Sequence, residues 1–333
     1  MDDAAAAPAP GGAGNPEELT VAVVSGGLTH ERDVSIRSGR RVGGALRSAG
    51  ARVEILDLDG ALLERLAALD PDVVWPVVHG AEGEDGSLQD LLGVLGLPFV
   101  GSSAAGARLA SDKPVSKAVL EHAGVATPSY VALPQSLFRE VGPRRVLDAV
   151  VGRLGMPLVV KPAAGGSALG VTLVEDRAQL PGAMVACFAY GPDALIERAV
   201  DGTEVAVSVV DLGDGPVALP PVEIATSDGP YDFDARYNPG RAEFFVPARL
   251  SADVAAEVAR TATTVHTALG LRDLSRIDLI VDHDGRPWVI DINVAPGMTE
   301  TSLFPQAASK GPTTAEELYL ALARRAVERG ANG

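Results

Sequence analysis

The chain has 333 residues, of which 47% are hydrophobic and 22% charged, so it can bury two or three cores and is not disordered as a whole. Its formal net charge of −16 repels nucleic acid and anionic membranes, and we expect neither as a partner. The single cysteine, Cys187, excludes an internal disulfide and favours a cytoplasmic protein.

The first part of the chain predicts a parallel α/β unit. Residues 1–18 are rich in Ala, Pro and Gly, lack the pattern of a secretory signal, and predict a disordered tail. Strands are expected at 20–25, 52–58 and 72–78, separated by helices at 33–49 and 61–69. This alternation indicates an open parallel sheet within residues 19–106. Ligands bind beyond the carboxyl ends of such strands, where Gly26-Gly27 and His79-Gly80 lie.

Residues 107–200 predict a second unit, in which strands are expected to pair antiparallel. A helix expected at 86–95 and a short strand at 97–101 close the first unit, and a further helix begins near Ser111-Asp112 in the second. A looser region punctuated by Pro128, Pro134 and Pro143 follows. The strand 158–162 then runs into a glycine-rich loop and a strand at 171–174, which predicts a flap in an antiparallel sheet.

Residues 201–330 predict a third unit. A strand expected at 194–197 ends the second unit, and a strand at 204–210 begins the third. The polar, aromatic segment 227–243 reads as a loop long enough to act as a lid. An amphipathic helix at 255–269 precedes a hairpin of strands 274–281 and 287–292, and a helix at 315–329 closes the chain.

The hairpin carries the first candidate for chemistry. Charged and apolar residues alternate in both strands, so Asp278, Asp291 and Asn293 can share one face. Two carboxylates and an amide oxygen are hard ligands suited to Mg²⁺ beside phosphate oxygens. An ordinary solvated strand face gives the same alternation, so the pattern alone leaves both interpretations open.

Lysine is rare in this chain, which has only Lys113, Lys117, Lys161 and Lys310. Lys161 ends a buried strand directly before the glycine-rich loop, where backbone N–H groups and an ammonium can hold phosphates. Lys113 stands at a predicted helix start and could equally be a surface residue. Glu31 and His79 lie at strand ends and are candidate substrate-binding groups. Glu31 could equally be a carboxylate at a helix start, and His79 a loop histidine without a role.

Together these stretches resemble the D-alanine–D-alanine ligases of the ATP-grasp superfamily over about residues 21–329. The resemblance is carried by the following segments: Ser25 to Ser35, His79-Gly80 with Gly83 to Gly86, Ser111 to Lys113, Val160 to Pro162, Tyr231 to Tyr237, Gly270 to Asp278, and Asp291 to Ser302. It implies an ATP-grasp fold of the α/β class, in which an N-terminal Rossmann-like parallel-sheet domain precedes two α+β subdomains that clamp ATP. It also implies ATP and two Mg²⁺ ions as cofactors, with Mn²⁺ as an alternative ion, amino-acid substrates and a homodimer.

The resemblance implies roles for individual residues. The catalytic residues would be Glu31, Ser167, Tyr237, Arg276 and Gly297. ATP would be bound by Lys113, Lys161, Glu197, Arg198, Ala199, Val200, Glu204 and Arg236. The magnesium ligands would be Asp278, Asp291 and Asn293, and the substrates would contact His79 and Ser302.

The implied reaction joins two D-alanines through an acyl phosphate, for peptidoglycan precursor synthesis. The sequence differs from the family's usual pattern at Asp291, where Glu is common, at Arg236, where Lys is usual, and at Val294-Ala295, which replaces Thr-Ser. These differences leave open a related ligase of specialised metabolism that joins other amino acids. A nucleotide-binding module without catalysis is disfavoured, because the lysines, the metal ligands and Arg276 are all present.

Overall fold

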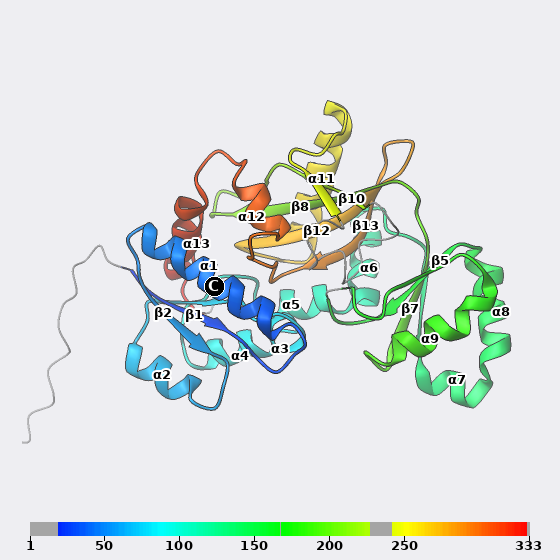
Figure 1. The fold of residues 1–333 in the computed structure, drawn as a ribbon, viewed down its shortest axis with the longest axis horizontal. Helices are drawn as coiled ribbons and strands as arrows, with labels where there is room; N and C mark the ends of the chain where they lie inside the picture. Colours follow the sequence, from blue (N-terminus) through cyan, green and yellow to red (C-terminus); the bar gives the residue numbers. More distant parts are fainter. Residues whose placement is uncertain (1–18, 167, 227–241, 332–333) are drawn as a thin grey trace, which may run out of the picture.

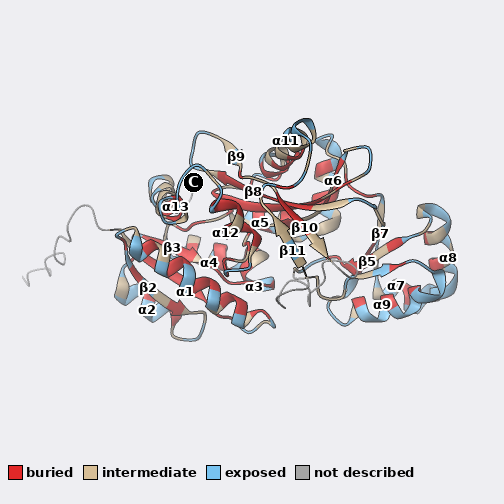
Figure 2. Cartoon of the chain, turned by 45° about the horizontal axis from the view of Figure 1, so that its top comes forward, coloured by how far each residue is buried: buried red, intermediate tan, exposed pale blue. Residues whose placement is uncertain are grey.

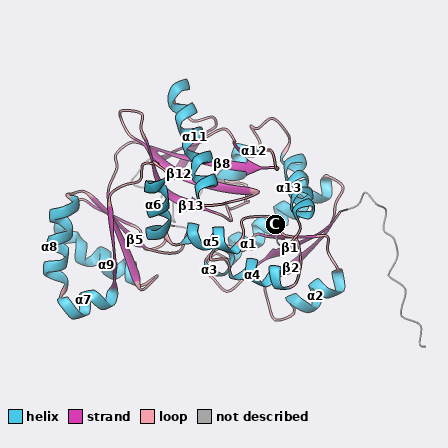
Figure 3. Cartoon of the chain, turned by 180° about the vertical axis from the view of Figure 1, so that it is seen from behind, coloured by secondary structure: helices cyan, strands magenta, loops and turns pink. Residues whose placement is uncertain are grey.

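The computed structural model describes residues 19–166, 168–226 and 242–331, whose strands form three separate sheets. A parallel sheet lies at one end, a large antiparallel sheet in the middle and a small antiparallel sheet at the other end (Figures 1 and 3). The parallel sheet agrees with the expected N-terminal unit, and the two antiparallel sheets agree with an expected pair of α+β units. Among the described residues, no helix is long and apolar enough to cross a bilayer.

The N-terminal unit contains β1 (Thr20–Ser25), α1 (Arg32–Ser48), β2 (Arg52–Asp57), α2 (Leu62–Leu69), β3 (Val73–Pro76), α3 (Ala81–Glu84), α4 (Ser87–Val94) and α5 (Ala104–Ser111). The strand order is β2-β1-β3, and both pairings are parallel. The strand predicted at 97–101 is wrong, because the segment makes only a single bridge between Val74 and Phe99. Pro98 has no N–H to donate, and Gly101, at φ 115°, turns the chain away.

The small unit contains β4 (Tyr130–Pro134), α7 (Gln135–Val141), α8 (Pro143–Leu154), β5 (Leu158–Pro162), β6 (Thr172–Val174), a 3₁₀ turn (Arg177–Gln179), α9 (Leu180–Phe188) and β7 (Asp193–Arg198). The strand order is β4-β7-β5-β6, antiparallel throughout, so the predicted flap of β5 and β6 is confirmed. The proline-punctuated region is more regular than expected. Pro143 starts α8, where the missing N–H of proline costs no helical hydrogen bond.

The large sheet and its helices contain α6 (Lys113–His122), β8 (Thr203–Asp211), β9 (Pro216–Ala218), β10 (Val222–Thr226), β11 (Ala242–Phe245), α11 (Ala252–Ala268), β12 (Leu274–Val281), β13 (Pro287–Asn293), α12 (Leu303–Ala308) and α13 (Ala315–Arg329). The strand order is β11-β10-β8-β12-β13. Asp112 caps α6 by accepting a hydrogen bond from the Val115 N–H, as its position before the helix predicts.

The predicted lid 227–243 is too long at its C-terminal end. Ala242 and Glu243 belong to β11, where they pair with Thr226 and Ala225 of β10. Pairing with β10 satisfies backbone groups that a loop would leave to water. Residues 227–241 of the predicted lid lie outside the described residues.

Two of the units share a hydrophobic core, and the third has its own. Trp75 of β3 and Tyr319 of α13 pack edge to face with ring centroids 5.5 Å apart, inside a core that joins the parallel sheet to the large sheet. The small unit buries a separate cluster between its sheet and helices, which includes Cys187. Burial raises the pKa of the Cys187 thiol to about 11, in keeping with a packing role. Figure 2 shows the exposed outer faces of α7, α8 and α9 around this core.

A buried ion pair fastens the N-terminal unit to the large sheet. The Asp273 carboxylate, 1% exposed, pairs with Arg329 and accepts a hydrogen bond of 2.7 Å from the Gly101 N–H. Arg329 also donates to the Phe99 carbonyl oxygen at 2.8 Å. Asp273 therefore connects the end of the N-terminal sheet to β12 and α13 through buried polar groups.

We predict that Asp273→Ala lowers the free energy of unfolding by about 3 to 5 kcal/mol, because the buried Arg329 loses its counter-ion. The replacement also strains the backbone, since residue 273 has a φ of 59°. Urea unfolding monitored by circular dichroism measures this change. Asp214→Ala, at an exposed aspartate, is the control and should change stability little. A loss below about 1 kcal/mol for Asp273→Ala would contradict the role of this pair.

Candidate active site

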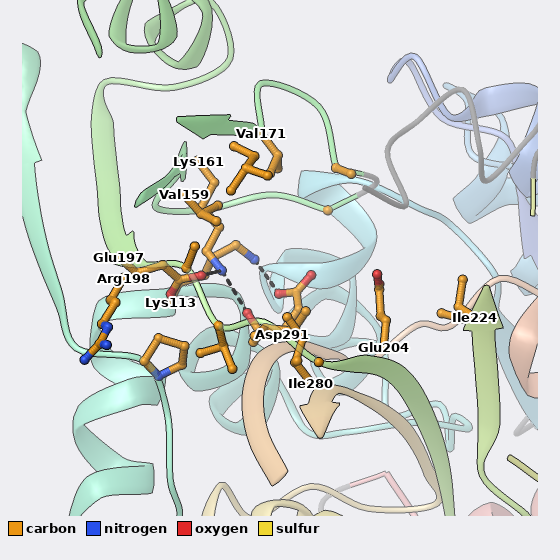
Figure 4. A pocket seen from close by; sticks show the side chains of 18 of the residues that line it. Lys113, Val159, Lys161, Val171, Glu197, Arg198, Glu204, Ile224, Ile280 and Asp291 are labelled. Carbon is orange, nitrogen blue, oxygen red and sulfur yellow. Dashed lines mark hydrogen bonds and ion pairs between the residues drawn. The ribbon is translucent and has the colours of Figure 1, made fainter. Parts of the chain in front are cut away.

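A cavity of about 500 Å³ separates the small sheet from the large sheet (Figure 4). Seven of the eight residues expected at ATP line it: Lys113, Lys161, Glu197, Arg198, Ala199, Val200 and Glu204. The eighth, Arg236, lies outside the described residues, as do Ser167 and Tyr237. Residues separated by more than 80 positions in the sequence thus meet at one cavity.

The cavity has one apolar part. Val159 of β5 and Val171, before β6, face it from the small sheet, and Ile224 of β10 and Ile280 of β12 face it from the large sheet (Figure 4). Apolar side chains from two sheets can enclose a flat ring, and the polar groups beside them can fix its orientation. On β5, strand alternation explains this placement, since Val159 and Lys161 are two residues apart and both line the cavity.

A buried cluster of ions forms the floor of the cavity. The Glu197 carboxylate, in a residue 2% exposed, lies 2.5 Å from the Lys161 ammonium and 2.8 Å from the Lys117 ammonium. Burial alone would raise the pKa of Glu197, but the two lysines lower it below its usual value. Lys117 also donates to the Thr127 hydroxyl at 2.5 Å, and burial lowers the pKa of its ammonium.

Lys117 is the residue that the sequence interpretation missed. Lys117 is one of the four lysines of the sequence, and no local pattern gave it a role. Asp112, which caps α6, fixes the helix start at Lys113, and Lys117 follows one turn later on the same face. The spacing of four residues on a predicted helix was therefore the available signal that both lysines face the same site.

The hairpin of β12 and β13 places the expected metal ligands as predicted. Asp278 is directly opposite Asp291, and Arg276 is directly opposite Asn293, so all four side chains share one face of the sheet. A bulge between Asp278 and Leu279 leaves Ile290 out of the regular register. The Ile290 carbonyl oxygen instead accepts a hydrogen bond of 2.9 Å from the Lys161 ammonium.

Each expected metal ligand has a partner within the protein. Arg276 binds both oxygens of Asp278, at 2.7 and 2.8 Å, and Lys113 lies 2.5 Å from Asp291. The Asn293 side-chain oxygen accepts a hydrogen bond from the Ala295 N–H at 2.9 Å. In the described ranges, no group of three or more His, Cys, Asp or Glu side chains is arranged as a metal site. The donors are nevertheless hard oxygens on one face, the chemistry that Mg²⁺ prefers.

A second cavity, of about 170 Å³, lies on the other side of Asp291. Glu84 of α3, Lys113, Gly166 and Asn293 line it, so the N-terminal unit reaches the glycine-rich loop here. A Cβ at Gly166 would lie 3.2 Å from a Glu84 oxygen, which shows how closely the loop approaches. Burial and the nearby Glu31 raise the pKa of Glu84 to about 8. Glu84 is a second residue for which the sequence gave no role.

His79 links the N-terminal unit to the loop after β13. Its Nδ1 donates to the Ala295 carbonyl oxygen at 3.1 Å, which leaves Nε2 to accept from the Ser38 hydroxyl at 3.2 Å. Ser38 in turn accepts a hydrogen bond from the Met298 N–H at 3.1 Å. Burial, together with the charge of Arg276, lowers the pKa of His79 to about 4, so the ring is neutral at pH 7.

Glu31, Gly297 and Ser302 surround this link. Glu31 is buried at the start of α1, and its N–H bonds to Thr29, whose hydroxyl donates to the His79 carbonyl oxygen at 3.0 Å. A Cβ at Gly297 would lie 2.8 Å from the Ser302 hydroxyl oxygen, so a side chain at residue 297 would collide with Ser302. The expected substrate residues thus lie around one turn at the carboxyl end of β13.

We predict that His79 makes stability depend on pH between about 6.5 and 4. Its folded pKa lies below its unfolded value, so in this window the unfolded chain binds more protons and stability falls as the pH falls. His79→Gln should reduce this slope by on the order of 1 kcal/mol per pH unit. Urea unfolding at pH 7, 6 and 5 measures the slope. The exposed-site control His283→Gln should keep the wild-type slope, and an unchanged slope in His79→Gln would refute the prediction.

Two family profiles match this sequence. The profile described as D-ala D-ala ligase N-terminus covers residues 60–102, and D-ala D-ala ligase C-terminus covers residues 119–322. The chain is 38% identical to the D-alanine–D-alanine ligase of Gloeobacter violaceus over 314 residues, 93% of this chain and 100% of that protein. It is also 38% identical to that of Moorella thermoacetica, over 87% of this chain and 93% of the relative.

Solved structures give the same result for the fold. The D-alanine–D-alanine ligase of Bacillus anthracis superposes with a TM-score of 0.80 at 29% identity, covering 93% of this chain and 98% of that one. Its complex with ATP superposes with a TM-score of 0.78 at 28% identity, covering 94% and 98%. On this sequence and structural evidence, the chain belongs to the D-alanine–D-alanine ligase family of ATP-dependent ligases.

Proposed function

We propose that this protein joins two molecules of D-alanine in an ATP-dependent reaction, and so supplies D-alanyl-D-alanine for peptidoglycan synthesis. The observation that carries the proposal is the meeting of the lysine-lined cavity with the hairpin face of Arg276, Asp278 and Asp291. Nucleotide phosphates, a carboxylate to be activated and a stabilising cation are the components that such a reaction needs within one site.

ATP would occupy the 500 Å³ cavity, with its base between the apolar side chains and its phosphates toward Lys113 and Lys161. The main chain from Glu197 to Val200 would frame the base, and Glu204 would bind the ribose. Without nucleotide, both lysines neutralise internal carboxylates, Lys113 that of Asp291 and Lys161 that of Glu197. The phosphates of ATP carry more negative charge than a carboxylate and would bind these ammonium groups more strongly. Arg236, on the expected lid, would add a third cation.

Asp278, Asp291 and Asn293 would hold magnesium, two ions by analogy with the family, and Mn²⁺ could replace it. When bound, the metal would neutralise charge on the phosphates as they react. The carboxylates are already matched with cations, Asp278 with Arg276 and Asp291 with Lys113, so their ligand oxygens are held in place and charged. The chemistry of the donor set fits this role.

The proposed reaction has two steps. The carboxylate of the first D-alanine attacks the γ-phosphate of ATP, which gives an acyl phosphate and ADP. The amine of the second D-alanine then attacks the acyl carbon, and the tetrahedral intermediate releases phosphate and the dipeptide. Arg276, held in one orientation by both oxygens of Asp278, would stabilise the oxyanion of this intermediate, together with the Gly297 main chain.

The amino-acid substrates would bind at the carboxyl ends of β1, β3 and β13. Glu31 would hold the ammonium of the first substrate, with Ser167 and Tyr237 as its partners, and Ser302 would contact the carboxylate of the second. Neutral His79 holds the loop at Ala295, and Ser38, its second partner, holds the loop at Met298. These bonds position the wall of this pocket. We expect the enzyme to act as a homodimer in the cytoplasm, where ATP is available.

A substrate panel tests the reaction. We expect ATP-dependent phosphate release and formation of D-alanyl-D-alanine from D-alanine, with Mg²⁺ or Mn²⁺ required and EDTA inhibitory. Phosphate release is measured with coupled detection and the dipeptide by mass spectrometry, across D- and L-amino acids. Turnover with another amino-acid pair but not with D-alanine would overturn the substrate assignment. ATP binding without ADP formation for every substrate would overturn the enzymatic assignment.

Lys161→Met should lower kcat/KM for ATP by about a hundredfold or more, because the phosphates lose a charge-assisted partner and Glu197 loses a counter-ion. Lys310→Met removes the same charge from an exposed position and is the matched control. Steady-state kinetics with varied ATP measure the effect, and thermal melts verify folding. Equal kinetics for the two variants would show that Lys161 does not act on the nucleotide.

A further inference from the structure

A cationic cavity of about 380 Å³ lies on the surface, distinct from the two cavities at the active site. Its lining residues are Arg37, Arg40, Arg41, Thr299, Glu300 and Thr301. The arginines come from α1 and the other three residues from the turn that precedes α12, which lies beside α1 in Figures 1 and 2. This cavity shares no lining residue with the nucleotide cavity.

The three arginines form a concentrated positive charge. Positions 37, 40 and 41 are three and four residues apart, so their side chains project from the same face of α1. Like charges at this spacing repel one another and weaken an isolated helix. Within the described ranges, no carboxylate lies within ion-pair distance of any of them.

This arrangement contrasts with the acidic balance of the chain as a whole. Acidic residues outnumber basic ones by 44 to 28, and several exposed arginines pair with a nearby acid. Examples are Arg108 with Asp90 and Arg260 with Glu257. A solvated arginine face in so acidic a protein would be expected to attract carboxylates of its own. Three clustered arginines around one cavity, offset by a single lining carboxylate, therefore favour a ligand that supplies negative charge.

We propose that this cavity binds a small organic phosphate. Three guanidinium groups and the single carboxylate of Glu300 leave a local charge of about +2, which matches a phosphate monoester dianion. Guanidinium groups bind phosphate oxygens in pairs, and the hydroxyls of Thr299 and Thr301 add donors of the kind that phosphates accept. The volume exceeds that of phosphate alone and is in the range of small-molecule sites, so the ligand carries an organic part.

The position of the cavity connects it to the active-site turn. The Thr299 N–H and hydroxyl both bond to the Ser302 hydroxyl, at 3.0 and 2.8 Å. Ser302 is also the residue that a Cβ at position 297 would meet. A ligand held by α1 and the turn 299–301 would therefore stiffen the segment that carries Gly297 and Ser302. The binding itself does not depend on the proposed function, which the test below can separate from it.

Isothermal titration calorimetry of the full chain with inorganic phosphate tests the site, in buffer matched with NaCl and without nucleotide, since ADP is itself an organic phosphate. We expect wild-type protein to bind one phosphate, and Arg40→Ala/Arg41→Ala to bind it roughly tenfold or more weakly. Arg144→Ala/Arg145→Ala removes the same charge from exposed positions on α8 and should bind within about twofold of wild type. Arg40→Gln, a milder change, should give an intermediate affinity.

Three outcomes would overturn the proposal. The first is wild-type protein that releases no binding heat with phosphate, and the second is unchanged binding in Arg40→Ala/Arg41→Ala. The third is an equal loss in the two double variants, which would show a general effect of net charge. Thermal melts of all variants verify folding. Ligase turnover is not used in this test, so loss of the proposed activity would leave the result for this site unaffected.

Discussion

The pairing of buried cations with buried carboxylates is the constraint on which this active site depends. Glu197 lies between Lys117 and Lys161, and the partly buried Asp291 binds Lys113, so each of these charges has a counter-ion. Removing one member of a buried ion pair costs about 3 to 5 kcal/mol, far more than a single hydrogen bond. Since Lys117 also contacts Glu197, that carboxylate would keep a counter-ion if Lys161 turned toward a phosphate. The site can therefore hold its cations ready for a ligand without leaving a buried charge uncompensated.

The hairpin of β12 and β13 sets the geometry of these pairs. Opposite residues of an antiparallel ladder share a face, so the register that places Asp278 against Asp291 also places Arg276 against Asn293. The bulge at Asp278 then releases the Ile290 carbonyl group from the ladder and gives Lys161 an acceptor. A shift by one residue would turn all of these side chains to the opposite face. The same register thus serves both the metal ligands and the phosphate-binding lysine.

Much of this could be predicted from local sequence patterns, because the relevant signals are periodic. Alternation in β12 and β13 gave the shared face of Asp278 and Asp291, and the apolar run before the glycines gave the strand that ends at Lys161. Partners far apart in sequence were not predictable in this way. His79 meets Ala295, 216 residues away, and nothing near His79 indicates that Ser38 will bond its other nitrogen. Such contacts arise from how whole sheets pack, which local patterns do not encode.

The distribution of the hydrophobic cores explains which pocket of this fold has fixed walls. The N-terminal sheet and the large sheet share one hydrophobic core, and Asp273 and His79 fasten them further by buried polar contacts. The pocket around Gly297 and Ser302 lies between these two units, so its walls are fixed before any ligand arrives. The nucleotide cavity instead separates the large sheet from the small unit, which has a core of its own. Among the described residues, no hydrophobic cluster joins the small unit to the large sheet, and buried ion pairs such as Lys117 with Glu197 connect them instead.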